Sequence, residues 1–204
     1  MNPAFHSIVV HVLTGTLVFG TFAAVALFAL RFSVFARFRY LAPAADQAAL
    51  FAIWIGTVVS LAGMATGFAI HSLEPSLNSP VIRNKISSGI LLIVTYGLFL
   101  FLRHRIGPRI WNNDLMAGFA AFLTVAGMHW NIVVNSIGGD VAGVPSGYES
   151  LVRLSGVETR FTYYLPTWTL LVIAGIAVAT LVLAYTDRGS KDDAQPEEAR
   201  VGEP

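Results

Sequence analysis

The segment HSIVVHVLTGTLVFGTFAAVALFAL, residues 6–30, decides the fold of this chain. It contains no Asp, Glu, Lys or Arg, and a stretch of about 20 mostly apolar residues can cross a bilayer as a helix. Arg31, Arg37 and Arg39 follow it among aromatic residues, which is typical of a helix end at the lipid headgroups. The segment therefore predicts a membrane-spanning helix from about residue 7 to residue 30.

The whole chain has the composition of an integral membrane protein. Of its 204 residues, 55% are hydrophobic and 12% are charged, whereas about 25% of the residues of a soluble domain are charged. Further apolar segments of spanning length follow the first one. We therefore expect an all-α fold, an integral membrane bundle of five transmembrane helices within residues 1–186, with spans at about residues 7–30, 47–70, 80–102, 115–137 and 166–185.

Turn and capping residues separate these spans. Asp46 is the candidate N-cap of the second helix, and Ser79, with Pro80 after it, is the candidate N-cap of the third. Residues 112–114 are polar and precede the fourth span in the same way. Residues 187–204 are charged and poor in apolar side chains, so we expect a disordered tail there.

The distribution of arginine predicts the orientation of the chain. Loops that stay in the cytoplasm carry an excess of Lys and Arg. Arginines follow the first span and the third span, at residues 31–39 and 103–109. We therefore expect the N-terminus outside and the C-terminus in the cytoplasm, in the inner membrane of a bacterium.

Composition excludes several kinds of function. The chain has no cysteine, which removes disulfides, thiolate catalysis and covalently attached haem. A net charge of +1 without a concentrated basic face argues against a nucleic-acid partner. The apolar cores of the spans contain no Asp, Glu, Lys or Arg, which argues against an ion pump. No nucleophile–base pair or paired carboxylates are visible, so hydrolytic or transferase chemistry is not expected.

Histidines are the candidate functional residues. In the expected topology His6 and His11 lie at the outer end of the first span, and His71 lies at the outer end of the second. His129 lies in the fourth span, at a depth similar to that of His11, roughly 6–12 Å inside the boundary. His104 is on the opposite side. Ligating groups at such depth in lipid are a functional hypothesis by default.

The histidines suggest a haem b held by two imidazoles from different helices near the outer surface. His11 with His129 is the first candidate pair, and His71 is the substitute for either. His6 and His11 are five residues apart, about 140° around a helix, so they cannot both face one ligand. Second-sphere hydrogen bonds are expected from the polar and indole side chains nearby, at Thr14, Trp130, Asn131 and Asn135.

Glycines accompany the histidines on their helix faces. Gly15 follows His11 by one turn, and Gly63 and Gly67 precede His71 on one face of the second span. Small residues at this spacing let a flat macrocycle approach a helix closely. The same spacing is also a common helix-packing pattern, so both interpretations stay open.

The opening stretch resembles an uncharacterised family of small bacterial multi-span membrane proteins. That family begins with His-Pro-x-x-x-His-Phe-Pro, and here His6 and His11 keep the spacing of the two histidines. Ser7 replaces the first proline of the pattern, and residues 12–13 replace its Phe-Pro. The Gly-Gly-Asp-Val segment at residues 138–141 is similar to a later glycine signature of the family. The resemblance directs attention to His6 and His11 without implying a reaction.

Three functions are compatible with these features. The first is a haem-b-binding electron-transfer protein or a subunit of a bacterial redox complex, with other membrane redox subunits or a periplasmic electron carrier as partners. The second is a cofactor-free structural or anchoring subunit in the lipid bilayer. The third is a metal or quinone site at the same residues, with His11, His71 and His129 as candidate metal ligands.

Overall fold

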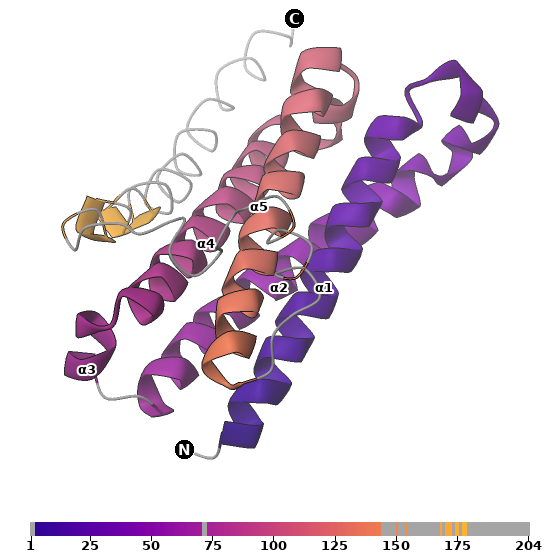
Figure 1. The fold of residues 1–204 in the computed structure, drawn as a ribbon. Helices are drawn as coiled ribbons and strands as arrows, with labels where there is room; N and C mark the ends of the chain where they lie inside the picture. Colours follow the sequence, from indigo (N-terminus) through magenta and orange to yellow (C-terminus); the bar gives the residue numbers. More distant parts are fainter. Residues whose placement is uncertain are drawn as a thin grey trace, which may run out of the picture.

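The computed structural model describes residues 3–70 and 73–143, with isolated positions from 150 to 178. Every element within the two described ranges is helical (Figure 1). The four long helices are α1 (Pro3–Ala29), α2 (Ala42–Ile70), α4 (Pro80–Ile106) and α5 (Asp114–Val141). The short elements are α3 (Leu73–Asn78) and two 3-10 helices, η1 (Ser33–Leu41) and η2 (Gly107–Trp111). This confirms the predicted all-α helical bundle.

Each long helix is long and apolar enough to cross a membrane. They correspond to the first four predicted spans, and each extends beyond its predicted bounds: α1 begins at Pro3, α2 begins at Ala42, α4 ends at Ile106 and α5 ends at Val141. The predicted fifth span, residues 166–185, and the predicted tail, residues 187–204, lie outside the continuously described ranges. The count of five helices and the orientation therefore stay predictions.

Two predicted N-caps are confirmed and one is wrong. Ser79 accepts a hydrogen bond from the backbone N–H of Ile82 at 3.4 Å, and Asn113 accepts one from the backbone N–H of Met116 at 3.1 Å. Asp46 does not cap a helix, because α2 already begins at Ala42 and Asp46 lies buried within it. Pro43 does not stop the helix, since the first turn needs no backbone N–H donors.

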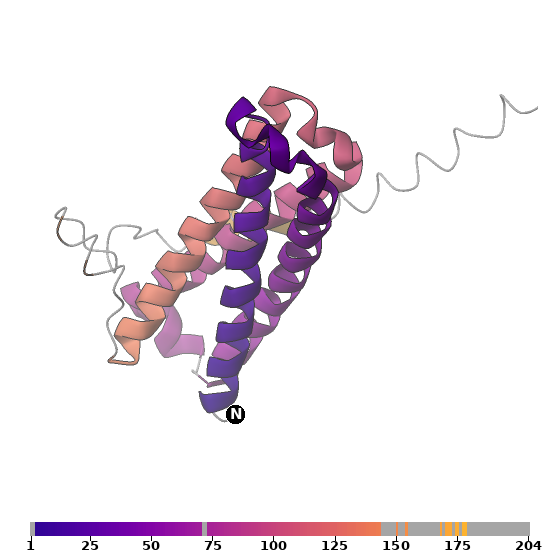
Figure 2. The same ribbon diagram turned by 90° about the vertical axis from the view of Figure 1, so that its right-hand side faces the viewer.

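Small residues hold α1 and α2 in close antiparallel contact (Figure 2). A Cβ atom on Gly20 would lie 2.6 Å from Cγ1 of Ile53, and one on Gly56 would lie 2.5 Å from Cδ2 of Leu17. Real Cβ atoms do not approach other atoms so closely. The glycines are therefore required where the two helix backbones meet, as in other membrane helix pairs.

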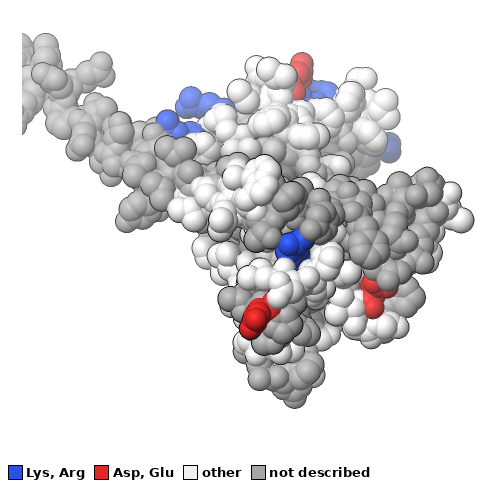
Figure 3. Space-filling view, turned by 60° about the vertical axis from the view of Figure 1, so that its left-hand side comes forward, with Lys and Arg blue, Asp and Glu red and all other residues white. Residues whose placement is uncertain are grey.

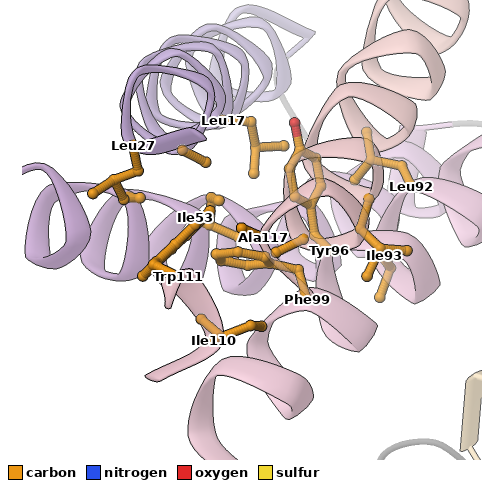
Figure 4. Packing of buried hydrophobic residues seen from close by; sticks show 14 of the residues in the cluster. Leu17, Leu27, Ile53, Leu92, Ile93, Tyr96, Phe99, Ile110, Trp111 and Ala117 are labelled. Carbon is orange, nitrogen blue, oxygen red and sulfur yellow. The ribbon is translucent and has the colours of Figure 1, made fainter. Parts of the chain in front are cut away.

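The apolar core lies where α1, α2, α4 and α5 meet. Leu17, Ile53, Tyr96 and Phe99 are fully buried there, and Figure 4 shows them facing one another from α1, α2 and α4. Tyr96 projects its hydroxyl toward α1, where it lies 2.8 Å from Oγ1 of Thr21. The interior thus combines close apolar packing with hydrogen bonds between helices.

A buried ion pair closes the bundle at the end where η1 and η2 lie. Arg103 donates from Nε and Nη2 to the two carboxylate oxygens of Asp46, at 2.8 and 2.5 Å. The indole N–H of Trp111 donates to the same carboxylate at 2.7 Å. At this end Arg31 also pairs with Asp114. These contacts join all four long helices at the arginine-rich end.

Candidate cofactor site at the histidine-bearing end

His6 lies on α1, half-buried against α2 and at the end opposite the ion pair. Its Nδ1 lies 2.8 Å from Oγ1 of Thr66. The Thr66 hydroxyl donates its one hydrogen to the carbonyl of Gly63 at 3.0 Å, so it can only accept from His6. A neutral His6 therefore carries its proton on Nδ1 and its lone pair on Nε2.

His11 lies one and a half turns further along α1 and is exposed on the outside of the described bundle. Its Nδ1 lies 2.7 Å from the backbone carbonyl oxygen of Ser7. A carbonyl oxygen can only accept, so Nδ1 of His11 is the donor and the lone pair of the neutral ring is on Nε2. Gly15, one turn on, has open space where a Cβ would lie.

His129 lies on α5 and packs edge-on against the ring of Trp130, with ring centroids 5.3 Å apart. Gly127 faces α4, because a Cβ there would lie 2.7 Å from the ring of Tyr96. His129 follows Gly127 by two residues, so its side chain leaves α5 about 160° away from the face on α4. It therefore points away from the centre of the bundle.

Two hydrogen bonds fix the level of His129 relative to α1. Nδ2 of Asn135 donates to Oγ1 of Thr14 at 3.0 Å, and Thr21 donates to the carbonyl of Thr124 at 3.3 Å. His129 thus lies opposite the part of α1 near Val18, about two helical turns, or roughly 10 Å, deeper than His11. The structure does not place the two at similar depth, because the register of α5 on α1, and not the distance of each histidine from its helix end, sets their relative depth.

The glycine face of α2 is filled by α1. A Cβ on Gly63 would lie 3.0 Å from Cδ2 of Leu13, and one on Gly67 would lie 3.5 Å from Cε1 of His6. Gly63 and Gly67 therefore serve helix packing in this structure, and a flat macrocycle would have to displace α1 to reach them. His71, on the same predicted face, lies outside the described residues.

The polar residues predicted to support a site bond to one another between α1 and α5. Asn135 donates to Thr14 and also to Oδ1 of Asn131 at 3.0 Å. Asn131 is buried, and its Nδ2 has no hydrogen-bond partner among the described atoms; the same holds for Oγ of buried Ser88. Thr14, Asn131 and Asn135 thus form a hydrogen-bonded polar group between α1 and α5.

Sequence reasoning missed the groups that orient the histidines. Thr66 is a hydroxyl-bearing residue in an apolar span. Its hydrogen bond with His6 depends on the register of α1 on α2, in which His6 lies against Gly67.

Within the described residues no group of three or more His, Asp or Glu side chains lies close enough to hold a metal ion. An iron held by two axial imidazoles needs only two protein ligands.

Comparison of the chain with family models, with curated proteins and with solved structures found no match, so its function has to be argued from these residues.

Proposed function

We propose that this protein is a membrane-embedded electron-transfer protein, or a subunit of a bacterial redox complex, that binds haem b at the histidine-bearing end of α1. The observation that carries the proposal is that Nδ1 of two histidines lies within hydrogen-bond distance of an acceptor oxygen. His6 and His11 both donate from Nδ1, to Thr66 and to the Ser7 carbonyl, which leaves the lone pair on Nε2. Metal-bound histidines are held in the same way, with the second ring nitrogen donating to a fixed acceptor.

The residues fit a haem iron in their chemistry. Imidazole is the usual axial ligand of b-type haem, and the iron supplies one-electron redox chemistry when bound. His6 and His11 point about 140° apart on α1, so one of them would hold the iron. The second ligand in this proposal comes from His71 or His129. Because the side chain of His129 leaves α5 away from the face on α4, a site that includes it would lie outside the four described long helices.

The proposed orientation places the histidine-bearing end outside the cytoplasm. Six arginines lie at the opposite end, within residues 31–39 and 103–109, which the positive-inside rule assigns to the cytoplasm. The proposed location is a bacterial inner membrane, with the N-terminus in the periplasm and a periplasmic electron carrier or another membrane redox subunit as partner. A reporter fused to the N-terminus tests this, because the orientation requires it to be active in the periplasm.

The absorption spectrum of the purified full-length protein tests the haem. A Soret band that sharpens and shifts on reduction with dithionite is expected, with iron present by elemental analysis. His6→Ala, His11→Ala, His71→Ala and His129→Ala should identify the ligands, since two of the four should lose or change the spectrum. His104→Ala is the matched control, because His104 lies at the arginine-rich end. A colourless protein without iron, purified from haem-replete cells, would contradict the proposal.

A cofactor-free anchoring subunit is the second candidate. It is favoured by the α2 glycine face, which packs on Leu13 and His6 of α1 rather than standing open. For this function the four histidine variants should leave the spectrum featureless and the fold unchanged. The anchoring function would then be supported if the protein co-purified with other membrane proteins and if those proteins no longer assembled with one another when this chain was absent.

A further inference from the structure

The 3-10 helix η1 (Ser33–Leu41) has an unusual surface. None of its residues is buried, although it contains several apolar side chains. Val34 is 79% exposed and Tyr40 is 74% exposed, and Phe32 and Phe35 are also exposed. The described bundle does not cover these side chains. They lie where α1 and α2 leave the apolar zone, so lipid is their natural apolar environment.

Among the described residues, the same end carries a large excess of positive charge. Residues 29–46 and 103–114 contain six arginines and only two carboxylates, Asp46 and Asp114. Both carboxylates are already engaged, Asp46 by buried Arg103 and Asp114 by Arg31. Figure 3 shows basic side chains gathered at this end, the upper end of the view. The remaining guanidinium groups are therefore not neutralised by carboxylates within these two segments.

Arg37 and Arg109 are two of these arginines, and the side chains of both are exposed on the surface of the described bundle. Arg37 is exposed and lies over the ring of Phe38, with its Cζ 4.6 Å from the ring centroid. Arg109 is exposed on η2 (Gly107–Trp111). Contacts of Arg31 with the Trp111 carbonyl and with Asp114 bring the end of α1, where η1 begins, next to η2. Guanidinium groups at this level match the phosphates of lipid headgroups in charge and geometry.

The opposite end of the bundle has no such excess. Its described charged residues are Glu74, Arg83, Lys85 and Asp140, two acidic and two basic. Within the described residues, an electrostatic preference for anionic lipid should therefore arise at the arginine-rich end. Among the described residues, exposed aromatic side chains lie beside exposed arginines at the arginine-rich end and not at the other.

We propose that η1 lies in the headgroup layer and that Arg37 and Arg109 bind the phosphate groups of anionic phospholipids at this end. The exposed rings enter the outer part of the acyl region, while the guanidinium groups stay at the level of the phosphates. Each arginine near an anionic surface contributes roughly a fivefold preference for anionic lipid at moderate salt. Neutralising both should therefore lower that preference roughly 20- to 30-fold.

The lipid preference of the full-length protein can be measured directly. The protein is reconstituted in an equimolar mixture of phosphatidylglycerol and phosphatidylcholine, and the lipids retained after purification are counted by native mass spectrometry. The ratio of the two retained lipids should favour phosphatidylglycerol, and this preference should fall as salt is raised. In Arg37→Gln/Arg109→Gln the ratio should fall toward one.

A charge-preserving variant separates electrostatics from folding. Arg37→Lys/Arg109→Lys keeps both charges, so it should keep most of the preference for phosphatidylglycerol. Circular dichroism should show the same helical content in both double variants. Equal retention of the two lipids by the unaltered protein, or an unchanged preference in the glutamine variant, would overturn the proposal. The proposal would also be overturned if the protein retained neither lipid and instead bound an acidic protein in a way that depends on these arginines.

Discussion

Arg103 and Asp46 form a doubly hydrogen-bonded ion pair in which each side chain is only 7% exposed, although 57 residues separate them in the sequence. The pair joins the start of α2 to the end of α4, and Trp111 adds a third hydrogen bond from η2. Both carboxylate oxygens of Asp46 and the indole N–H of Trp111 thus have hydrogen-bond partners. The arginine-rich end is therefore fixed by a specific network rather than by apolar contact alone.

Loss of one member of the pair should destabilise the protein strongly. Arg103→Met leaves the Asp46 carboxylate buried with only the Trp111 indole as donor, which should cost about 3–5 kcal/mol. Asp46→Leu/Arg103→Met removes both charges and should be more stable than Arg103→Met alone. Unfolding of the detergent-solubilised protein in increasing SDS measures this. A double variant that loses as much as the sum of the two single variants would contradict a direct pairing.

The contact between α1 and α2 predicts opposite outcomes for two glycine substitutions. Gly56→Ala places a Cβ 2.5 Å from Leu17, so the helices must separate and about 1–3 kcal/mol of stability should be lost. Gly97→Ala in α4 meets no atom within 4 Å and should be neutral or slightly stabilising, because alanine favours helix. The same SDS titration compares the two variants. Similar effects of both would show that close packing at Gly56 does not matter.

The hydrogen bond between the hydroxyl groups of Tyr96 and Thr21 joins α4 to α1 and should contribute a small part of the stability. Thr21 donates to the Thr124 carbonyl, so the Tyr96 hydroxyl is the donor in its 2.8 Å contact with Thr21. Tyr96→Phe removes that bond and keeps the ring against Gly127. The expected loss is about 0.5–1.5 kcal/mol, as for other hydrogen bonds between membrane helices. In a double-mutant cycle with Thr21→Val, a coupling energy of zero would argue against the bond.

The long apolar helices of the described residues could be predicted because their signal is local. A run such as residues 7–30 contains enough apolar residues to cross a bilayer, whatever the rest of the chain does. The caps at Ser79 and Asn113 are local too, since each depends on a polar side chain and a backbone N–H three residues later. These features were confirmed for that reason.

The interactions that failed prediction are those between distant segments. Asp46 looks like an N-cap after Pro43, and nothing near it in the sequence indicates that its partner is Arg103. The depth of His129 relative to His11 depends on the register of α5 on α1, which hydrogen bonds between distant segments set. The pairing of His6 with Thr66 requires the register of α1 on α2. Such relations follow from packing, which periodicity alone does not specify.

The hydrogen bond between His6 and Thr66 provides the sharpest test of the histidine-bearing end. Thr66→Val keeps the shape of the side chain and removes the acceptor that holds the His6 proton on Nδ1. If His6 ligates haem iron, loss of this supporting bond should lower haem affinity about 10- to 100-fold. Thr57→Val is the matched control, because Thr57 lies on the same helix and its hydroxyl donates to the Ile53 carbonyl.

Haem titration of the two variants, followed at the Soret band, gives the comparison. Weaker binding in Thr66→Val but not in Thr57→Val would assign His6 as the ligand on α1. Unchanged binding in Thr66→Val, together with loss of binding in His11→Ala, would assign His11 instead, since its Nδ1 is held by the Ser7 carbonyl and does not depend on Thr66. The two outcomes differ because the two histidines rely on different acceptors.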